Sequence, residues 1–235
     1  MSKPHDNKAA KSAILGKIRR SLSAVGAVAD PNRETARAEV LERLASKPLG
    51  IVPKRGEVGA YEKVAMFMDY AERVSSTTAR IASYDDLPGA IADYLRAHNL
   101  PQSIITGSDP RLAAVNWQSE PQLERKLGPS DGTDLVGVNH ALGGVAETGT
   151  SILASGPDNP TTINFLPENH IIVVHADDIA GNYESIHDRL RDLGGTAHMP
   201  RALNMITGPS RSGDIEQKIM LGAHGPRAVH VIVVG

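Results

Sequence analysis

The stretch TARIASYDDLPGAIADYLRAHNLPQSIITG, residues 78–107, carries the clearest fold signal in this chain. It begins and ends with short runs that have the composition of β-strands, TARIAS and QSIITG. The run between them, DDLPGAIADYLRAHN, places apolar residues at helical spacing. A helix between two strands is the crossover connection that parallel strands need. The stretch therefore predicts parallel strands covered by helices, which is an α/β fold.

The same alternation continues along the rest of the chain. Further helical runs are expected at 109–117 and 182–195, and further strands within 134–142, 144–155, 170–176, 202–208 and 228–235. Around residues 143–155, consecutive β-like runs are separated by too few residues for a crossover helix, so antiparallel pairing is expected there. The sequence predicts an open α/β sheet with one locally antiparallel part.

The first fifty residues follow a different pattern. Two apolar stripes at helical spacing predict two helices, the first through Ile14, Leu15, Ile18, Leu22 and Val25, the second through Val40, Leu41 and Leu44. A segment rich in Pro, Gly and Lys, SKPLGIVPKRG, follows them, and a third helical pattern spans 57–75. We expect a helical arm at 1–50, able to pack on its own domain or on a neighbouring chain, and an α/β domain at 51–235.

Composition excludes several classes of protein. The 235 residues have a net charge of −2 and 3% aromatic residues, which does not suit nucleic-acid binding. They contain no cysteine, which excludes disulfides, thiolate nucleophiles and cysteine-ligated clusters, and which suits a cytoplasmic protein. No apolar run approaches the roughly 18 residues of a membrane span. The nine histidines have no metal-site spacing, so no metal site is predicted.

Three glycine-bearing segments follow or flank predicted strands: GGVAETGTS (143–151), TGPSRSGDIE (207–216) and GAHGP (222–226). Ligands in open α/β sheets bind at the carboxyl ends of strands, and glycine lets backbone N–H groups approach an anion. None of the segments matches a phosphate-binding loop or a dinucleotide fingerprint. We expect the side chains of these segments to face one another across a single site, with a small carboxylate or phosphate as the ligand.

Six residues of these segments are the candidate site residues, and each also has a structural interpretation. Glu147 is a candidate acid/base, ligand contact or nucleophile, or else it pairs with an arginine or caps a turn. His224 is a second catalytic candidate, or a loop histidine with satisfied hydrogen bonds. The ligand-binding candidates are Thr148, Thr150, Ser210 and Arg211. The threonines are otherwise strand residues with local hydrogen bonds, and Ser210 and Arg211 otherwise form a turn that Asp214 would follow as a cap.

The motifs AETGT (146–150), GPSRSGDIE (208–216) and LGAHGP (221–226), in this order and before a final strand, resemble the lactate-utilisation protein C family, also called the LUD domain. The similarity extends from about residue 58 to residue 235; one departure is Ser212-Gly213, where the family has Thr-Ala. The resemblance implies an open three-layer α/β sheet of the sugar-phosphate isomerase and CoA-transferase type. It also implies a part in oxidising L-lactate to pyruvate together with two iron–sulfur partner proteins.

The resemblance leaves the chemistry of this chain itself open. Lactate oxidation needs an electron acceptor, and a chain without cysteines or a dinucleotide fingerprint has no evident place for a redox cofactor of its own. The first hypothesis is therefore a non-redox subunit of an L-lactate oxidation system, a component of an L-lactate dehydrogenase complex in organic acid metabolism. The alternative is a stand-alone transferase or isomerase that acts on a phosphorylated or CoA-type small substrate.

Overall fold

The computed structural model describes residues 7–27, 33–192, 199–213 and 219–235. The chain divides into two units, Met1–Leu49 and Gly50–Gly235, and each is described by itself. The expected Asp214 cap and the Asp-Ile-Glu end of the second motif lie outside the described residues.

The first unit consists of the two predicted helices, α1 (Asn7–Ala27) and α2 (Arg33–Ser46). Within this unit, the apolar stripes remain open to solvent: Leu22 and Leu44 are both exposed, as are Ile14, Ile18, Val40 and Leu41. The prediction of two helices in this part of the chain is confirmed. The role of these residues as an arm stays a prediction.

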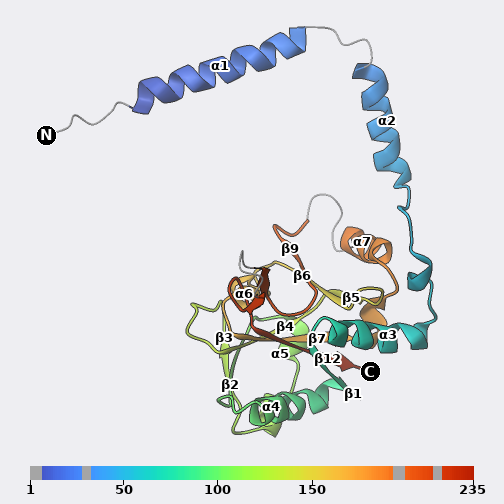
Figure 1. Ribbon diagram of the computed structural model, residues 1–235, viewed down its shortest axis with the longest axis vertical. Coiled ribbons are helices and arrows are strands. Elements are labelled where there is room, and N and C mark those ends of the chain that lie inside the picture. The colour runs from blue at the N-terminus through green and yellow to red at the C-terminus, as the bar shows by residue number, and fades with distance from the viewer. Residues whose placement is uncertain (1–6, 28–32, 193–198, 214–218) are drawn as a thin grey trace, which may run out of the picture. The chain divides into compact units, whose positions relative to one another are not determined.

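The second unit is built on a six-stranded sheet in the order β1-β12-β7-β4-β2-β3 (Figure 1). Its strands are β1 (Thr77–Ile81), β2 (Ser103–Thr106), β3 (Glu124–Leu127), β4 (Val136–His140), β7 (Asn169–His175) and β12 (Ala228–Val234). Every neighbouring pair in this sheet is parallel. The parallel sheet predicted from residues 78–107 is therefore confirmed, while the charged edge strand β3 is an addition that the sequence did not predict.

A second, four-stranded sheet has the order β8-β5-β6-β9. It consists of β5 (Gly143–Val145), β6 (Thr150–Ala154), β8 (Ile179–Ala180) and β9 (Leu203–Ile206). β5 and β6 pair antiparallel, as predicted for this part of the chain, and β6 pairs antiparallel with β9. A short hairpin of β10 (Arg211–Gly213) and β11 (Ile219–Leu221) follows. Arg211 begins this hairpin, while Ser210 lies just before it and after a bend at Gly208 and Pro209.

Helices complete the second unit. The α-helices are α3 (Ala60–Arg73), α4 (Leu87–Ala97), α5 (Pro110–Ala113), α6 (Thr162–Phe165) and α7 (Tyr183–Asp192). The 3-10 turns are η1 (Lys54–Gly56), η2 (Tyr84–Asp86), η3 (Trp117–Ser119) and η4 (Ala176–Asp178). Asp109 caps the first turn of α5 by accepting a hydrogen bond from the Arg111 backbone N–H at 2.9 Å. Pro110 has no backbone N–H, and it stands at the start of the helix, where such a group would have no helical acceptor.

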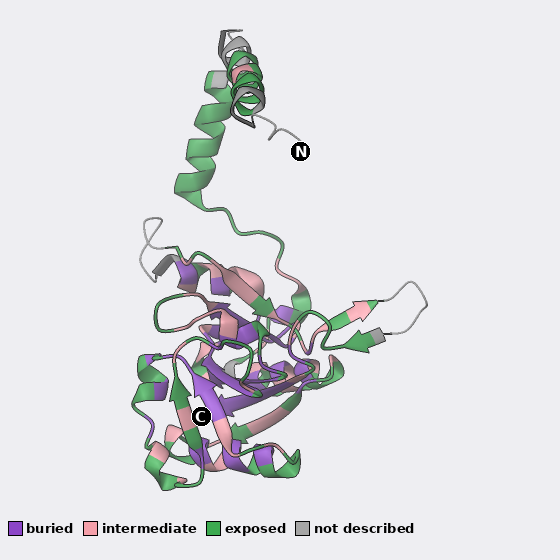
Figure 2. Ribbon diagram, turned by 90° about the vertical axis from the view of Figure 1, so that its left-hand side faces the viewer, coloured by how far each residue is buried: buried purple, intermediate pink, exposed green. Residues whose placement is uncertain are grey.

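Alternate side chains of the central sheet enter two separate cores, because successive residues of a strand point to opposite faces. One core joins Ile171 of β7 and Ile232 of β12 to Ile91 of α4, and it also contains buried residues of β2, β4 and α5. The other core joins Ile172 of β7 to Phe67 of α3 and to the second sheet. The inner strands β4, β7 and β12 are almost entirely buried, whereas the edge strands β1 and β3 are partly exposed (Figure 2). The result is the predicted open three-layer α/β fold.

Gly149 ties the second sheet to α3. It lies in the turn between β5 and β6 with a φ of +64°, in the left-handed region that favours glycine. A Cβ built on Gly149 would lie 2.3 Å from the backbone nitrogen of Ala71. No side chain fits in that gap, so the turn and the last part of α3 are in backbone-to-backbone contact. This contact places the AETGT motif.

The substitution Gly149→Ala should lower the free energy of unfolding by roughly 3 kcal/mol or more, the sum of left-handed strain and a displaced turn. The matched control is Gly132→Ala, because Gly132 also has a positive φ, of +94°, but a Cβ added there would meet no atom of the described residues within 4 Å. In the control, the free energy of unfolding should fall only by the cost of the strain, about 1–2 kcal/mol. Urea denaturation of both variants measures the difference, and equal losses would show that the contact with α3 contributes nothing.

Candidate functional site

The second and third glycine-bearing segments meet at one pocket of about 300 Å³. Its walls come from the end of β9, the segment that leads into β10, the segment that leads into β12, the end of α6 and the first residues of β7 and β12. Three predicted residues line it, namely Ser210, Arg211 and His224. The pocket lies at the amino ends of β7 and β12, not at the carboxyl ends where the sequence analysis expected the site, because the GAHGP segment precedes its strand.

Backbone hydrogen bonds hold the two segments together. The Ser210 N–H donates to the Pro226 carbonyl at 2.8 Å, and the Gly222 N–H donates to the Ser210 carbonyl at 3.0 Å. The His224 N–H donates to the Ser210 hydroxyl oxygen at 3.3 Å. Ser210 is thus the point where the two segments are joined, and its hydroxyl group faces the exposed His224 loop.

Arg211 is anchored to the end of α3. Its Nη2 donates to the Val74 carbonyl at 2.9 Å and to the Ser75 hydroxyl at 2.5 Å. A cation is favourable at a helix C-terminus, where the last carbonyls carry partial negative charge. Gly208, with a φ of +83°, approaches the same place, since its Cβ would lie 2.4 Å from the Val74 oxygen. These contacts hold the guanidinium at the pocket wall.

A cluster of four hydroxyl groups connects the pocket to the AETGT motif. The Thr150 Oγ1 lies 2.7 Å from the Thr148 Oγ1, 2.9 Å from the Tyr183 hydroxyl and 2.7 Å from the Thr207 Oγ1. Thr150 is fully buried, whereas Thr207 is exposed and lines the pocket. Thr148 and Thr150 are therefore linked to the pocket through Thr207. Thr150 begins β6, whereas Thr148 lies in the turn before it, and only the bond between these two threonines is local in the sequence. The ligand-binding role of both threonines stays a prediction.

Glu147 lies away from the pocket. Its side chain is 3% exposed, and its Oε2 lies 3.6 Å from the Nε of the exposed Arg55 on η1. No hydrogen bond reaches this Oε2 among the described residues. The arginine partner of the structural interpretation is present, but the distance is too long for a hydrogen bond, so the carboxylate stays incompletely satisfied. The expected single site thus divides into the pocket and the Glu147 region, because the turn after β5 directs Glu147 toward η1.

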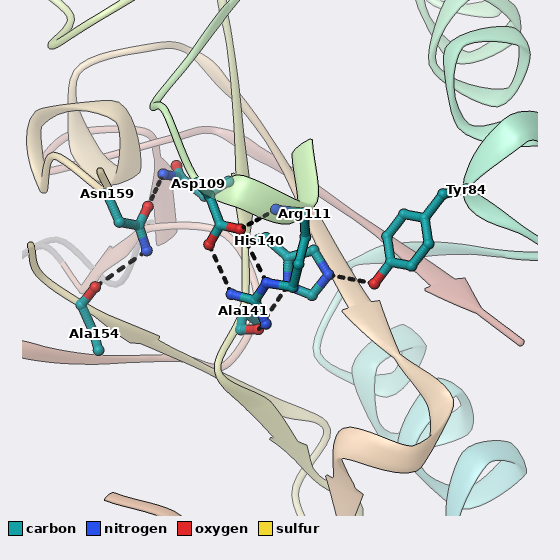
Figure 3. A network of polar contacts seen from close by, with 8 residues as sticks. Tyr84, Asp109, Arg111, His140, Ala141, Ala154 and Asn159 are labelled. Carbon is teal, nitrogen blue, oxygen red and sulfur yellow. Dashed lines mark hydrogen bonds and ion pairs between the residues drawn. The ribbon is translucent and has the colours of Figure 1, made fainter. Parts of the chain in front are cut away.

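Sequence reasoning missed a polar network at the carboxyl ends of the central strands (Figure 3). Arg111 Nε and Nη2 donate to the two carboxylate oxygens of Asp109 at 2.9 and 2.7 Å, and Arg111 Nη1 donates to the Ala141 carbonyl at 3.2 Å. The Tyr84 hydroxyl lies 2.7 Å from His140 Nε2, and His140 Nδ1 lies 2.8 Å from the Ala141 carbonyl. A carbonyl only accepts, so Nδ1 carries the proton and Nε2 accepts from Tyr84.

The network lies where the connections that follow two neighbouring strands, β2 and β4, run in opposite directions along the sheet. β2 leads through α5 to β3 at one edge of the sheet, whereas β4 leads through the second sheet toward β7 on the other side. Such a reversal is the usual ligand position of open α/β sheets. The signal available in the sequence was the place of each residue: Tyr84, Asp109 and His140 all stand at or shortly after the end of a strand. Their convergence depends on strand order, which the sequence alone did not supply.

Burial sets the protonation states of this network. Burial, followed by the charge of Arg111, lowers the pKa of His140 to about 4. Burial raises the pKa of Tyr84, so its hydroxyl stays protonated and donates to His140. Burial alone would raise the pKa of Asp109, but the hydrogen bonds and charge of Arg111 outweigh it and lower that pKa. At neutral pH the network holds a neutral histidine beside one carboxylate–guanidinium pair.

Stability should fall as the pH is lowered from about 6.5 toward 4, because the unfolded chain binds a proton on His140 that the folded chain excludes. The slope is about 1.4 kcal/mol per pH unit for each such histidine. His140→Asn should flatten the pH dependence of the free energy of unfolding by about one proton, whatever its effect at pH 7. His230→Asn, at a second buried histidine whose pKa burial lowers to about 4, should flatten the slope by a similar amount. An unchanged slope in His140→Asn would contradict the assignment.

Comparisons with known proteins place these features in a family context. A family model described as the LUD domain matches residues 111–234. The lactate utilization protein C of Anoxybacillus flavithermus is 33% identical over 90 residues, which are 38% of this chain and 39% of that protein. The protein of the same name from Geobacillus thermodenitrificans is 29% identical over 186 residues, 71% of this chain and 72% of that protein.

A third relative, the lactate utilization protein C of Bacillus subtilis, is 29% identical over 151 residues, 55% of this chain and 62% of the relative. The chain thus spans about two fifths of the length of one of these relatives and between three fifths and three quarters of the other two. Among solved structures, a DUF162 family protein from Deinococcus radiodurans matches with a TM-score of 0.54 and 23% identity. That match covers 76% of this chain and 99% of the other, and it supports the fold alone.

Proposed function

The chain belongs to the LUD domain family, and on this premise we propose that it acts in lactate utilisation as a subunit without a redox cofactor of its own. The family resemblance predicted from the three glycine-bearing motifs is confirmed. The proposed function draws on the relatives, which are named lactate utilization protein C. In this proposal the chain contributes to the oxidation of L-lactate to pyruvate together with two iron–sulfur proteins.

The observation that carries this proposal is the absence of cysteine from all 235 residues. Oxidation of lactate to pyruvate releases two electrons, and iron–sulfur clusters, which would receive them, are held mainly by cysteine thiolates. The chain also lacks the fingerprint that binds a dinucleotide in a Rossmann fold. In this proposal the electrons therefore pass to partner proteins, and this chain binds a small ligand or organises the partner proteins.

The pocket supplies the binding part of the proposal. Arg211 brings a guanidinium group to its wall, and such a group pairs well with a carboxylate or phosphate. Ser210 adds a hydroxyl group, and His224 lies exposed on the opposite segment. We assign Ser210 and Arg211 to ligand binding, with Thr148 and Thr150 supporting the wall through Thr207. His224 and Glu147 remain the proposed groups for proton transfer.

The proposed location is the cytoplasm, where proteins rarely contain disulfides. None of the helices in the described ranges combines the length and apolar character that crossing a membrane requires.

A pull-down tests the partnership. The tagged chain, recovered from cells grown on lactate, should bring down two cysteine-rich proteins with iron–sulfur absorbance. The chain purified alone should be colourless and should not oxidise lactate with an artificial electron acceptor. Stoichiometric flavin or cluster on the chain alone would contradict the proposal. A self-sufficient activity on a phosphorylated or CoA-type substrate, without such partners, would favour the alternative transferase or isomerase function.

The substitution Glu147→Gln tests the second part of the candidate site. It keeps the shape of a side chain that is 3% exposed and removes a buried charge whose ion-pair partner, Arg55, is exposed, so the melting temperature should stay unchanged or rise. Growth on lactate should be impaired if the carboxylate acts in the reaction.

A matched control is Glu168→Gln, because Glu168 forms an ion pair with Arg227 of similar length, 3.7 Å, but both side chains are exposed. The control should change neither growth nor stability. A large loss of stability in Glu147→Gln with growth intact would mean that Glu147 is a structural ion-pair partner.

A further inference from the structure

The helix α1 carries a row of apolar side chains that stay open to water. Ile14, Ile18 and Leu22 follow one another at intervals of four residues, so they lie along one face of the helix, and Leu15 lies beside them. Their exposed fractions are 60%, 49% and 67%, and that of Leu15 is 40%. Contiguous exposed apolar side chains mark surfaces that bind a protein or a membrane. We call these four residues the apolar face of α1.

The charge of α1 has a single sign. The helix contains no Asp or Glu, whereas it contains five basic residues: Lys8, Lys11, Lys17, Arg19 and Arg20. Lys17 and Arg19 are the neighbours of Ile18, so each lies about 100° around the helix from it, and together they flank the apolar face on both sides. Long basic side chains in such positions cover apolar surface with their stems while their charged ends reach a polar layer.

The rest of the chain does not share this positive charge. Residues 1–49 contain ten Lys and Arg against five Asp and Glu, a net charge of +5, whereas residues 50–235 contain 15 against 22, a net charge of −7. Within the first unit, α2 has three basic and three acidic residues. The excess of positive charge is therefore concentrated on α1. A negatively charged surface attracts this helix and repels the larger unit.

Charge and apolar surface together decide what covers the apolar face. The α1 helix of a second copy would bring five further positive charges against it, which is unfavourable. A nucleic acid matches the charge but offers no apolar layer to the aliphatic side chains. An anionic bilayer offers both, since its headgroups attract Lys and Arg and its acyl chains accept aliphatic side chains. We propose that α1 binds the surface of an anionic lipid bilayer, with its apolar face toward the acyl chains and Lys17 and Arg19 at the headgroups.

In this arrangement α1 lies on the bilayer and does not cross it. Its five basic residues are incompatible with the hydrocarbon layer, in agreement with the finding that no helix in the described ranges is suited to span a membrane. Helices of this kind bind in the plane of the interface, and their affinity depends on the lipid composition. The inference goes beyond the proposed function, because neither the oxidation of lactate nor the partner proteins require a lipid surface.

Sedimentation of the full chain with lipid vesicles tests the proposal. Vesicles with equal parts of phosphatidylcholine and phosphatidylglycerol should bind the chain at least about tenfold more tightly than vesicles of phosphatidylcholine alone, because each basic side chain near an anionic surface contributes about fivefold. Salt at about 1 M, which shortens the Debye length to about 3 Å, should weaken the binding. Equal binding to the two kinds of vesicle, or no binding to either, would overturn the proposal.

The substitution Leu22→Gln tests the apolar part of the interaction. Binding to the anionic vesicles should fall about tenfold, because the variant loses an aliphatic side chain that the bilayer would bury. The matched control is Leu127→Gln on the edge strand β3, since Leu127 is 64% exposed and Leu22 is 67% exposed. The control should bind like the parent. Unchanged binding of Leu22→Gln would mean a purely electrostatic attraction, as for a nucleic acid, and would contradict the bilayer as the partner.

The substitution Lys17→Glu tests the charge. It changes the charge of α1 by two units, so binding to the anionic vesicles should fall about 25-fold. Lys54→Glu is the control, because Lys54 is also an exposed lysine but belongs to η1 of the second unit, and the net charge of the chain changes equally. Equal losses in the two variants would show that the total charge governs binding and that α1 is not the binding surface.

Analytical ultracentrifugation without lipid examines the competing partner, a second copy of the chain. The parent and Leu22→Gln should sediment as the same species, because the apolar face of α1 is not an interface between copies in this proposal. A dimer of the parent that Leu22→Gln dissociates would show that a second copy covers this face, and the bilayer assignment would then be wrong.

Discussion

The positions of the second sheet and of the pocket wall depend on close backbone contacts with the C-terminal end of α3. Gly149 brings the turn of the second sheet against the Ala71 nitrogen, and Gly208 brings the segment before β10 against the Val74 oxygen. Arg211 then donates to the same Val74 carbonyl. Two glycine motifs that lie about sixty residues apart in the sequence therefore dock side by side on one helix end. Because both approaches are too close for a Cβ atom, the position of the pocket wall follows from backbone contact.

Two polar regions of the molecule contrast in how they are satisfied. At the carboxyl ends of the central strands, Tyr84, Asp109, Arg111 and His140 use one another and the Ala141 carbonyl as partners (Figure 3). A network with its donors and acceptors paired stabilises and orients the loops that carry it. The pocket at the amino ends has the opposite character, with buried atoms that find no partner among the described residues. The first arrangement suits a rigid support, and the second suits a place for a ligand.

Much of the fold was readable from sequence because hydrophobic periodicity reports which face of an element is buried. The parallel sheet followed from residues 78–107, and the antiparallel part followed from the short spacing around residue 150. The edge strand β3 was missed, since its sequence ERKL is largely charged and only partly covered. An exposed edge strand does not need the apolar alternation that the interpretation relied on.

The candidate site was only partly readable. The glycine motifs identified Ser210, Arg211 and His224, which do share a pocket. They did not reveal that Glu147 points toward η1, because the direction of a side chain in a turn depends on backbone angles that no pattern records. His170 is one of the nine histidines without metal-site spacing, and Asn164 lies in none of the three motifs. Both line the pocket, each with a buried polar atom that has no partner among the described residues, which is a property of three-dimensional packing.

The place of β12 has a consequence for how the chain folds. β12 is the last strand along the sequence, yet it lies between β1 and β7 in the central sheet. Thr77 and His230, paired at 2.8 Å, are 153 residues apart. Contacts between such distant residues form slowly, because a long loop must close before they are made. During synthesis, the edges of β1 and β7 that pair with β12 therefore stay unpaired until β12 leaves the ribosome, and only then can β12 join the two parts of the sheet.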